Sequence, residues 1–205
     1  MAAIVSGAVP PEPPMPRAHI VETAAALFRE RGYDGVGVAE LMAAAGFTHG
    51  GFYNHFESKS ALAGEALAHA FHEMERVRET MPGREAFVKS YMSDAARDAP
   101  GATCPAASLA GDIARQPDAI KEVFAEGIER MIDWMQNASS ATPMAREEAV
   151  DLICRMVGAL MLARAMPASS DLRRELLVTE TQQCLIDLPK SAGEPRRRPK
   201  SPRSA

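Results

Sequence analysis

The stretch Gly35–Leu62, GVGVAELMAAAGFTHGGFYNHFESKSAL, predicts two short helices joined by a tight turn. The first helix, over residues 38–45, carries Leu41 and Met42 on an apolar face. Gly46 follows this helix, and a residue without a Cβ adopts the positive φ of such a turn at no steric cost. Two helices joined by a short glycine turn form a helix-turn-helix, whose second helix can enter the major groove of DNA.

The second helix is expected over residues 49–56. Phe52 and Phe56 share one face of it and pack inward, because positions i and i+4 are neighbours on a helix surface. The remaining side chains of this segment face outward or sideways and are the candidates for contact with DNA. They are Thr48, which also stands at a capping position, His49, Gly50, Gly51, Tyr53, Asn54 and His55.

The same segment resembles the N-terminal domain of TetR-type transcriptional regulators, and the likeness extends over residues 17–66. The residues that carry it are Ala45-Gly46-Phe47-Thr48, Gly51-Phe52-Tyr53-Asn54-His55-Phe56, Ser58-Lys59 and Leu62, preceded by Ile20, Ala24, Leu27-Phe28 and Gly32-Tyr33. The resemblance implies an all-α protein with a three-helix DNA-binding head and a larger helical domain for ligand binding and dimerisation. It also implies a homodimer that binds a palindromic operator, in many cases as a repressor released by a small ligand.

Transferred by position, the resemblance assigns phosphate contacts to Tyr53 and Lys59, and the groove-facing side to His49, Gly50, Gly51 and His55. At the start of the first helix, Val38 and its neighbours offer little more than backbone N–H groups to a phosphate. Two alternatives remain open. Tyr53 can be a structural hydroxyl, and both histidines can be solvated surface residues.

The head is acidic. Residues 17–80 hold six Lys or Arg and nine Asp or Glu, a net charge of −3. Few phosphates can be neutralised, so we expect modest non-specific affinity for DNA and a shallow dependence on salt. The segment 190–205 holds six Lys or Arg against one Glu and three prolines, and is predicted to be a disordered basic tail.

Helix periodicity with clear breakers continues to residue 188, and no segment alternates with the period of a strand. The 205 residues include 37 Ala but only 5% aromatics, which also favours helices. The predicted domains are a disordered proline-rich arm (1–16), the DNA-binding domain (17–66), a helical regulatory domain (67–189) and the tail. Helices are expected over 17–31, 59–80, 84–98, 105–115, 117–139, 144–166 and 170–188.

The regulatory domain offers weaker signals. Cys104 precedes a helix whose dipole can stabilise a thiolate, so it is either a sensor of oxidants and electrophiles or a small buried filler. The helices at 144–166 and 170–188 carry broad apolar faces, which belong either to a dimer interface or to the monomer core. Residues proposed to line a pocket for a small apolar ligand are Met92, Phe124, Met131, Trp134 and Met161.

Several classes of protein do not fit the sequence. No apolar run is long enough to span a membrane, and the chain does not open on a secretory signal. Three widely spaced cysteines suggest neither a disulfide framework nor a zinc site, so we expect a cytoplasmic protein without metal or cofactor. Glu-x-x-His pairs, nucleophile motifs and glycine-rich phosphate loops are missing, which argues against an enzyme. The alternative to a regulator is a helical protein-interaction module that has lost DNA binding.

Overall fold

The structure, a computed structural model, describes residues 16–138 and 143–189. Within these ranges it contains helices and no strand, so the predicted all-α class is confirmed. In chain order the elements are α1 (Pro16–Arg31), α2 (Val38–Ala44), the 3₁₀ helix η1 (His49–Asn54), α3 (Lys59–Glu79), α4 (Arg84–Tyr91), α5 (Asp94–Asp98), the 3₁₀ helix η2 (Pro100–Ala102), α6 (Pro105–Ile113), α7 (Asp118–Asn137), α8 (Arg146–Arg164) and α9 (Leu172–Asp187).

The predicted breakers of the first helices act as expected. Gly32 and Gly46 have φ of +74° and +80°, in the region that favours glycine. The Gly32 N–H closes the last turn of α1 on the carbonyl of Phe28, at 2.8 Å. Ser58 caps α3, since its hydroxyl accepts a hydrogen bond from the Ala61 N–H at 3.1 Å. These groups therefore set where α1, α2 and α3 begin or end.

Two predicted helices differ from the structure. The segment expected as a helix over 49–56 is a 3₁₀ helix that ends at Asn54, and the Thr48 side chain makes no capping hydrogen bond. Gly50 and Gly51 explain the difference, because glycine is among the poorest helix formers. The helix expected over 84–98 is split into α4 and α5, because the Ser93 hydroxyl accepts from the Ala96 N–H and starts a new helix there.

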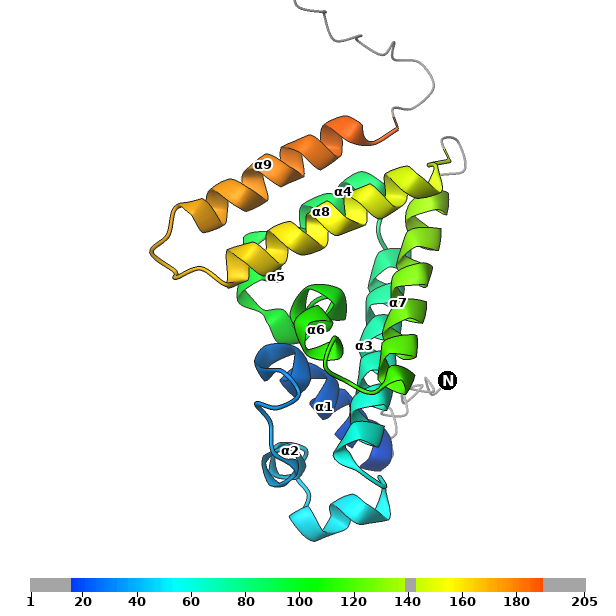
Figure 1. The fold of residues 1–205 in the computed structure, drawn as a ribbon, viewed down its shortest axis with the longest axis vertical. Coiled ribbons are helices and arrows are strands. Elements are labelled where there is room, and N and C mark those ends of the chain that lie inside the picture. Colours follow the sequence, from blue (N-terminus) through cyan, green and yellow to red (C-terminus); the bar gives the residue numbers. More distant parts are fainter. Residues whose placement is uncertain (1–15, 139–142, 190–205) are drawn as a thin grey trace, which may run out of the picture.

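The elements form an elongated molecule with the head at one end (Figure 1). α1, α2, η1 and the first part of α3 surround one apolar core, and α4 and α6–α9 enclose a second. α3 and α7 lie side by side along the molecule, and α8 and α9 cross its far end (Figure 1). Phe124 and Ile128 on α7 pack against both cores, so the head is continuous with the rest of the chain.

The predicted domain limits fall differently on the structure. The limit at 66/67 lies inside α3, so one helix belongs to both predicted domains. Pro16, assigned to the arm, is the first residue of α1. The remainder of the arm and the tail at 190–205 lie outside the described residues. No helix within 16–138 or 143–189 combines the length and the apolar character that crossing a bilayer requires.

The packing of α3 on α7 depends on a glycine. A Cβ added to Gly127 would lie 2.3 Å from the Phe71 ring, which is fully buried. This distance is far below van der Waals contact, so only glycine allows the ring to lie against the α7 backbone.

Gly127→Ala is therefore expected to lower the free energy of unfolding by about 1–3 kcal/mol, because overpacking displaces the Phe71 ring. Gly111→Ala is the matched control, since Gly111 is exposed on α6 and its Cβ would meet no atom within 4 Å. That control should be neutral or raise stability by up to about 1 kcal/mol. Urea unfolding measures both, and equal stability of the two variants would contradict the packing argument.

Candidate nucleic-acid interface and ligand cavity

η1 presents its polar side chains to solvent at the end of the head. Thr48, His49, Gly50 and Asn54 are exposed, and Tyr53 is 68% exposed. The Phe52 ring on the opposite face is fully buried and meets the Tyr53 ring edge-on at 5.2 Å between centroids. Because Phe52 fixes the element from inside, the Tyr53 hydroxyl is free to contact another molecule.

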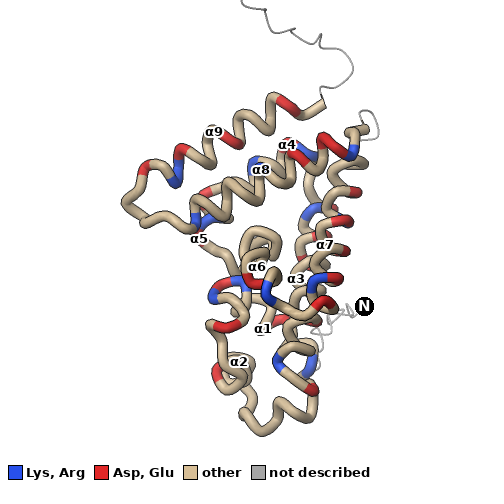
Figure 2. The backbone as a smooth tube through the Cα atoms, viewed as in Figure 1, with Lys and Arg blue, Asp and Glu red and all other residues tan. Residues whose placement is uncertain are grey.

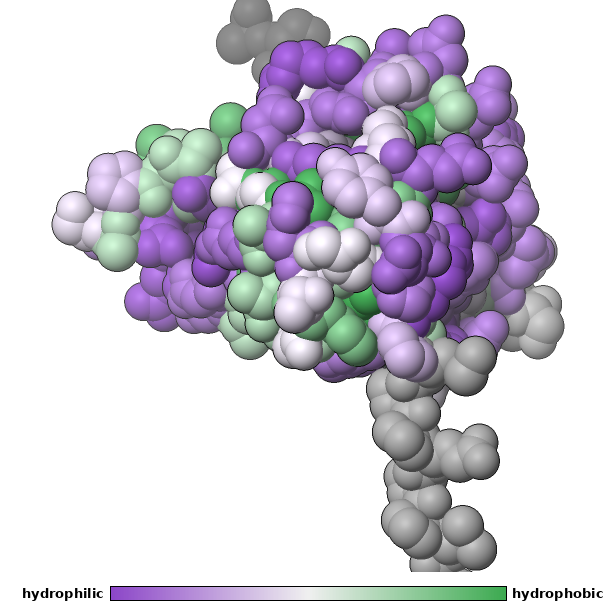
Figure 3. Space-filling model, turned by 90° about the horizontal axis from the view of Figure 1, so that it is seen from below, coloured by the Kyte–Doolittle hydropathy of each residue, from purple (hydrophilic) through white to green (hydrophobic). Residues whose placement is uncertain are grey.

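The surface around η1 carries almost no charge. No Lys, Arg, Asp or Glu occurs between Leu41 and Phe56, and Figure 2 shows the lowest part of the head without coloured segments. Seen from below, pale and weakly hydrophobic residues occupy the centre of this face, with hydrophilic residues at its side (Figure 3). Such a surface would contact DNA through hydrogen bonds and close approach, with little help from charge.

The two histidines and Lys59 differ in their surroundings. His49 is exposed, whereas His55 is half-buried and its carbonyl accepts from Arg17 Nε at 3.4 Å. Lys59 is also half-buried, and its ammonium donates to the carbonyl of Tyr33. An ammonium has three donors, so this bond leaves others for a phosphate, and the predicted DNA contact of Lys59 stays a prediction.

The two other predicted contact residues lie close to the protein interior. Val38 opens α2 and packs half-buried against the head core, so only its backbone is left for a phosphate. Gly51 is half-buried, and a Cβ there would lie 3.7 Å from Met42 Cε. At Gly50 a Cβ would meet nothing within 4 Å. Gly50 is therefore the position at which the backbone itself is open to a ligand.

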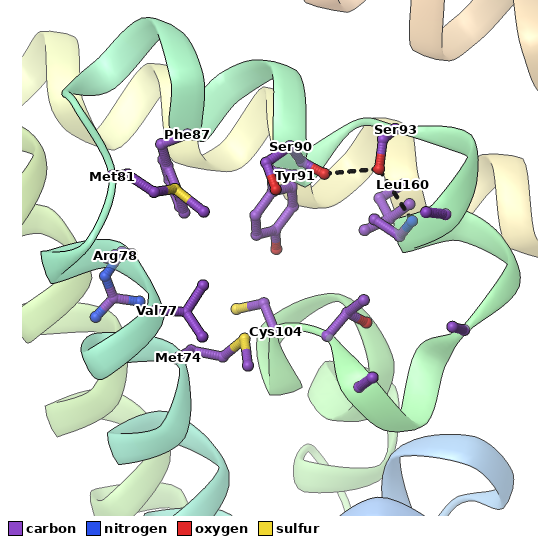
Figure 4. Close-up of a pocket in the computed structure, with 15 residues that line it drawn as sticks. Met74, Val77, Arg78, Met81, Phe87, Ser90, Tyr91, Ser93, Cys104 and Leu160 are labelled. Atoms are coloured by element: carbon purple, nitrogen blue, oxygen red, sulfur yellow. Dashed lines mark hydrogen bonds between the residues drawn. The ribbon is translucent and has the colours of Figure 1, made fainter.

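A second candidate site is a cavity of about 300 Å³ between the end of α3, α4, α5, η2 and the start of α6. Its size is at the lower end of the range for small-molecule pockets. Met74, Met81, Phe87 and Leu160 form much of the apolar wall (Figure 4). Cys104, at the N-terminus of α6, also borders the cavity and is 5% exposed. Its predicted sensor role stays a prediction.

The five residues predicted for a ligand pocket do not line this cavity. Met131 is fully buried in the second core, where Met92 and Met161 also pack. Trp134 lies behind the wall, with its ring 5.0 Å from that of Phe87, and Phe124 packs on Phe71 at 5.7 Å. The pocket assigned to these five residues stays a prediction, and the cavity found here is lined by other residues.

Two polar groups of the cavity lack hydrogen-bond partners. The Tyr91 hydroxyl points from α4 toward the Cys104 thiol (Figure 4), and the thiol is its close polar neighbour among the described residues, without a hydrogen bond of normal geometry. Nε and Nη2 of Arg78 on α3 are also buried without a partner. Burial raises the pKa of Tyr91 well above its usual value, so its hydroxyl is protonated. Burial lowers the pKa of Arg78, although a guanidinium keeps its charge at neutral pH.

A network of hydrogen bonds joins the cavity to the head. Arg29 on α1 donates from Nη1 to the carbonyl of Thr103, at 2.9 Å, and from Nη2 to Glu73 Oε2, at 2.8 Å. Thr103 is a wall residue of the cavity. Its hydroxyl accepts from Arg164 on α8, at 2.6 Å. The same short segment therefore contacts the cavity, the first helix of the head and a helix at the far end.

Comparison with known proteins identifies the head. The family profile described as "Bacterial regulatory proteins, tetR family" matches residues 20–66. The chain is 47% identical over 60 residues to the HTH-type transcriptional repressor DhaR of Mycobacterium sp. strain GP1. This match covers 29% of the chain and 30% of DhaR. A TetR family regulator of Agrobacterium tumefaciens has the same fold, with a TM-score of 0.67 and 21% identity over 83% of this chain and 95% of that one.

Residues 20–66 match the TetR family profile, and the helices of the chain have the fold of solved TetR family regulators. The helices outside residues 20–66 share that fold at low identity, as a further solved structure illustrates. AibR, crystallised with isovaleryl coenzyme A and operator DNA, superposes with a TM-score of 0.56 and 17% identity. The superposition covers 82% of this chain and 97% of AibR. The matched head and the all-helical body agree with the sequence prediction.

Sequence reasoning missed several residues of both sites. Arg17 holds the end of η1, since it donates to Glu65 at 2.6 Å and lies 4.9 Å from the Phe56 ring centroid. Arg29 and Arg78 read as ordinary charged positions on helices, and only the tertiary structure buries them. Tyr91 belongs to no sequence motif that indicates a ligand site. A buried arginine gives no signal in one sequence, because lysine and arginine are common on exposed helix faces.

The buried Tyr33, which supports the helix-turn-helix, generates a pH prediction. Its ring contacts the Phe28 ring at 4.9 Å, and its hydroxyl lacks a hydrogen-bond partner. Burial, and secondarily the charge of Asp112, raises the pKa of Tyr33 far above that of an unfolded tyrosine. Above about pH 10 the unfolded state therefore binds fewer protons than the folded state, and stability falls as the pH rises.

Tyr33→Phe should remove up to about 1.4 kcal/mol per pH unit of this alkaline loss, while it leaves stability at pH 7 unchanged or higher. Urea unfolding of both proteins between pH 8 and 11 measures the difference. If the free energy of unfolding falls equally with pH in both proteins, the buried neutral phenol of Tyr33 is not the cause of the alkaline loss.

Proposed function

We propose that this TetR family regulator is a homodimeric repressor that binds a palindromic operator and releases it when a small ligand enters the cavity. The observation that carries the proposal is the exposed row Thr48, His49, Tyr53 and Asn54 on η1, within the segment that matches the family. Protonated or neutral histidine donates to guanine acceptors, and a tyrosine hydroxyl donates to a phosphate. DhaR, which is similar over 60 residues, is named a repressor.

The dimer part of the proposal rests on α8 and α9. Leu162 is 54% exposed, and on α9 Leu172 and Ile186 are 47% and 64% exposed. Val150, Cys154, Gly158 and Leu162 follow one another at intervals of four along α8 and leave an apolar strip with small residues. Exposed apolar surface of this kind marks protein interfaces. α8 and α9 lie at the far end from η1 (Figure 1), so a pair joined there keeps both heads free.

The release part rests on the contacts of Thr103. A ligand that displaces the wall segment around Thr103 alters its bonds to Arg29 on α1 and to Arg164 on α8. A Cβ at Gly101 would lie 2.5 Å from Glu30 Oε1, so η2 packs directly on α1 and has little space to move independently. A shift at the cavity is therefore transmitted to the head through contact and not through a long flexible path.

DNA binding is tested by selecting fragments of the source genome with purified full-length protein at low and near-physiological salt. We expect enrichment of one palindromic sequence. Tyr53→Phe should then weaken binding to that sequence roughly 2- to 10-fold, because it removes one hydrogen bond of about 0.5–1.5 kcal/mol. Tyr33→Phe is the matched control, since it removes the same atom from a buried ring in the same head.

Enrichment of no sequence by a folded dimer would reject the operator proposal. The uncharged surface around η1 would then favour the protein-interaction module as the function of this fold. If Tyr53→Phe and Tyr33→Phe bind the operator with equal affinity, the phosphate contact of Tyr53 is rejected, and the operator proposal itself is kept.

The interface is tested with Leu162→Glu and Ile186→Glu. Each should weaken dimerisation about tenfold or more, because association buries a carboxylate without a partner. Ala119→Glu, at an exposed position on α7, is the control that adds the same charge elsewhere. Sedimentation equilibrium reports the dissociation constants. If the variant that combines Leu162→Glu with Ile186→Glu dimerises as tightly as the unchanged protein, the interface lies elsewhere.

A further inference from the structure

The charge around the cavity limits the kind of ligand that it accepts. Arg78 is the charged residue of the cavity wall, and none of the described wall residues is Asp or Glu. Arg78 is 2% exposed and makes no ion pair among the described residues, and the nearby Glu75 pairs with Arg130. Glu75 acts on Arg78 only from a distance at which no ion pair forms, so an anion in the cavity would stabilise the buried guanidinium further.

A second arginine adds positive charge behind the wall. Arg164 on α8 donates to the carbonyl of Ala96 and to the hydroxyls of Thr103 and Ser108, at 2.6, 2.6 and 2.9 Å. All three acceptors are neutral, so its charge also lacks a partner within the described residues. Arg78 in the wall and Arg164 behind it both lie near the Tyr91 hydroxyl and the Cys104 thiol. The cavity therefore lies in a region of positive potential that no acidic residue of the described wall offsets.

The Tyr91 hydroxyl supplies a donor at that point. It is buried, points into the cavity toward the Cys104 thiol (Figure 4), and makes no hydrogen bond of normal geometry with an oxygen or nitrogen acceptor of the described residues. An unpaired buried hydroxyl loses its hydration without compensation, so a ligand that accepts a hydrogen bond from it gains affinity. Ser93 does not compete for this role, because its hydroxyl donates to the carbonyl of Ser90 at 2.8 Å.

The rest of the cavity is suited to an apolar chain or ring. Met74, Met81, Phe87 and Leu160 line it (Figure 4). The thioether side chains adapt to different apolar shapes. A volume of about 300 Å³ admits a molecule of modest size and excludes a large conjugate from the closed part of the cavity.

We propose that the ligand of this cavity is a small amphipathic acid, with its apolar part against the methionines and Phe87 and its carboxylate or equivalent anion beside Tyr91, balanced by Arg78 and Arg164. This inference names the class of ligand in the proposed function. It rests on that proposal only for the claim that the ligand releases the protein from DNA. The binding preference itself is a property of the cavity and is measured without DNA.

The experiment compares matched acids and alcohols on the purified full-length protein. The probes are octanoate against 1-octanol and 3-phenylpropanoate against 3-phenylpropanol, titrated by calorimetry at pH 7. We expect at least one acid to bind about tenfold or more tightly than its alcohol, because a charge-assisted hydrogen bond forms only with the acid. Arg78→Met should abolish this preference, whereas Arg76→Met, on the exposed side of α3, should keep it.

Tyr91→Phe covers the case in which Arg78→Met fails to fold. It removes a hydroxyl without a hydrogen-bond partner, so the fold is retained, and the preference for the acid should fall about threefold or more. Three results would overturn the proposal. They are equal binding of acid and alcohol, no binding of either acid, and an undiminished preference for the acid in both Arg78→Met and Tyr91→Phe. A protein that prefers the acid but binds no operator would retain this inference and reject the proposed function.

Discussion

The position of the helix-turn-helix head depends on one buried cation. Arg29 lies on α1 with its side chain 3% exposed, and its three groups donate to Ala25, Thr103 and Glu73. These acceptors belong to α1, to the segment after η2 and to α3. A guanidinium is planar and holds several acceptors in fixed directions, so it orients all three elements at once. Arg29 therefore links the wall of the cavity directly to the first helix of the head.

The cavity and the head thus share residues instead of being separate modules. Thr103 borders the cavity with one side and accepts from Arg29 and Arg164 with its polar atoms. α3 begins beside η1 with Lys59 and ends at the cavity with Arg78. α3 runs without interruption across residue 66, the predicted limit between the two domains, which stays a prediction. Binding in the cavity and binding at η1 are two perturbations of one packed structure.

Local signals in the sequence predicted the fold, and long-range packing determined what they missed. Gly32, Gly46 and Ser58 act within their own turns, so their roles could be read from the sequence. The shortening of η1 follows from Gly50 and Gly51, where poor helix propensity outweighed the expected periodicity. The wall of the cavity and the burial of Arg78 depend on which faces of distant helices meet, and a single sequence does not contain that information. For the same reason the sequence does not tell that Met131 and Trp134 pack in the second core and not on the wall of this cavity.

Gly83 connects α3 to α4 with φ of +133°, a conformation that other residues rarely adopt, although a Cβ there would meet no atom within 4 Å. The restriction is therefore purely one of backbone geometry. α4 carries Phe87 and Tyr91, so the turn at Gly83 sets the direction in which these two wall residues enter the cavity. Related chains that evolve to recognise other molecules can exchange the side chains of the wall freely. A replacement of Gly83 changes the direction of a whole helix in one step. We therefore expect ligand specificity to diverge by substitution of the wall residues, while the glycine at this position is kept.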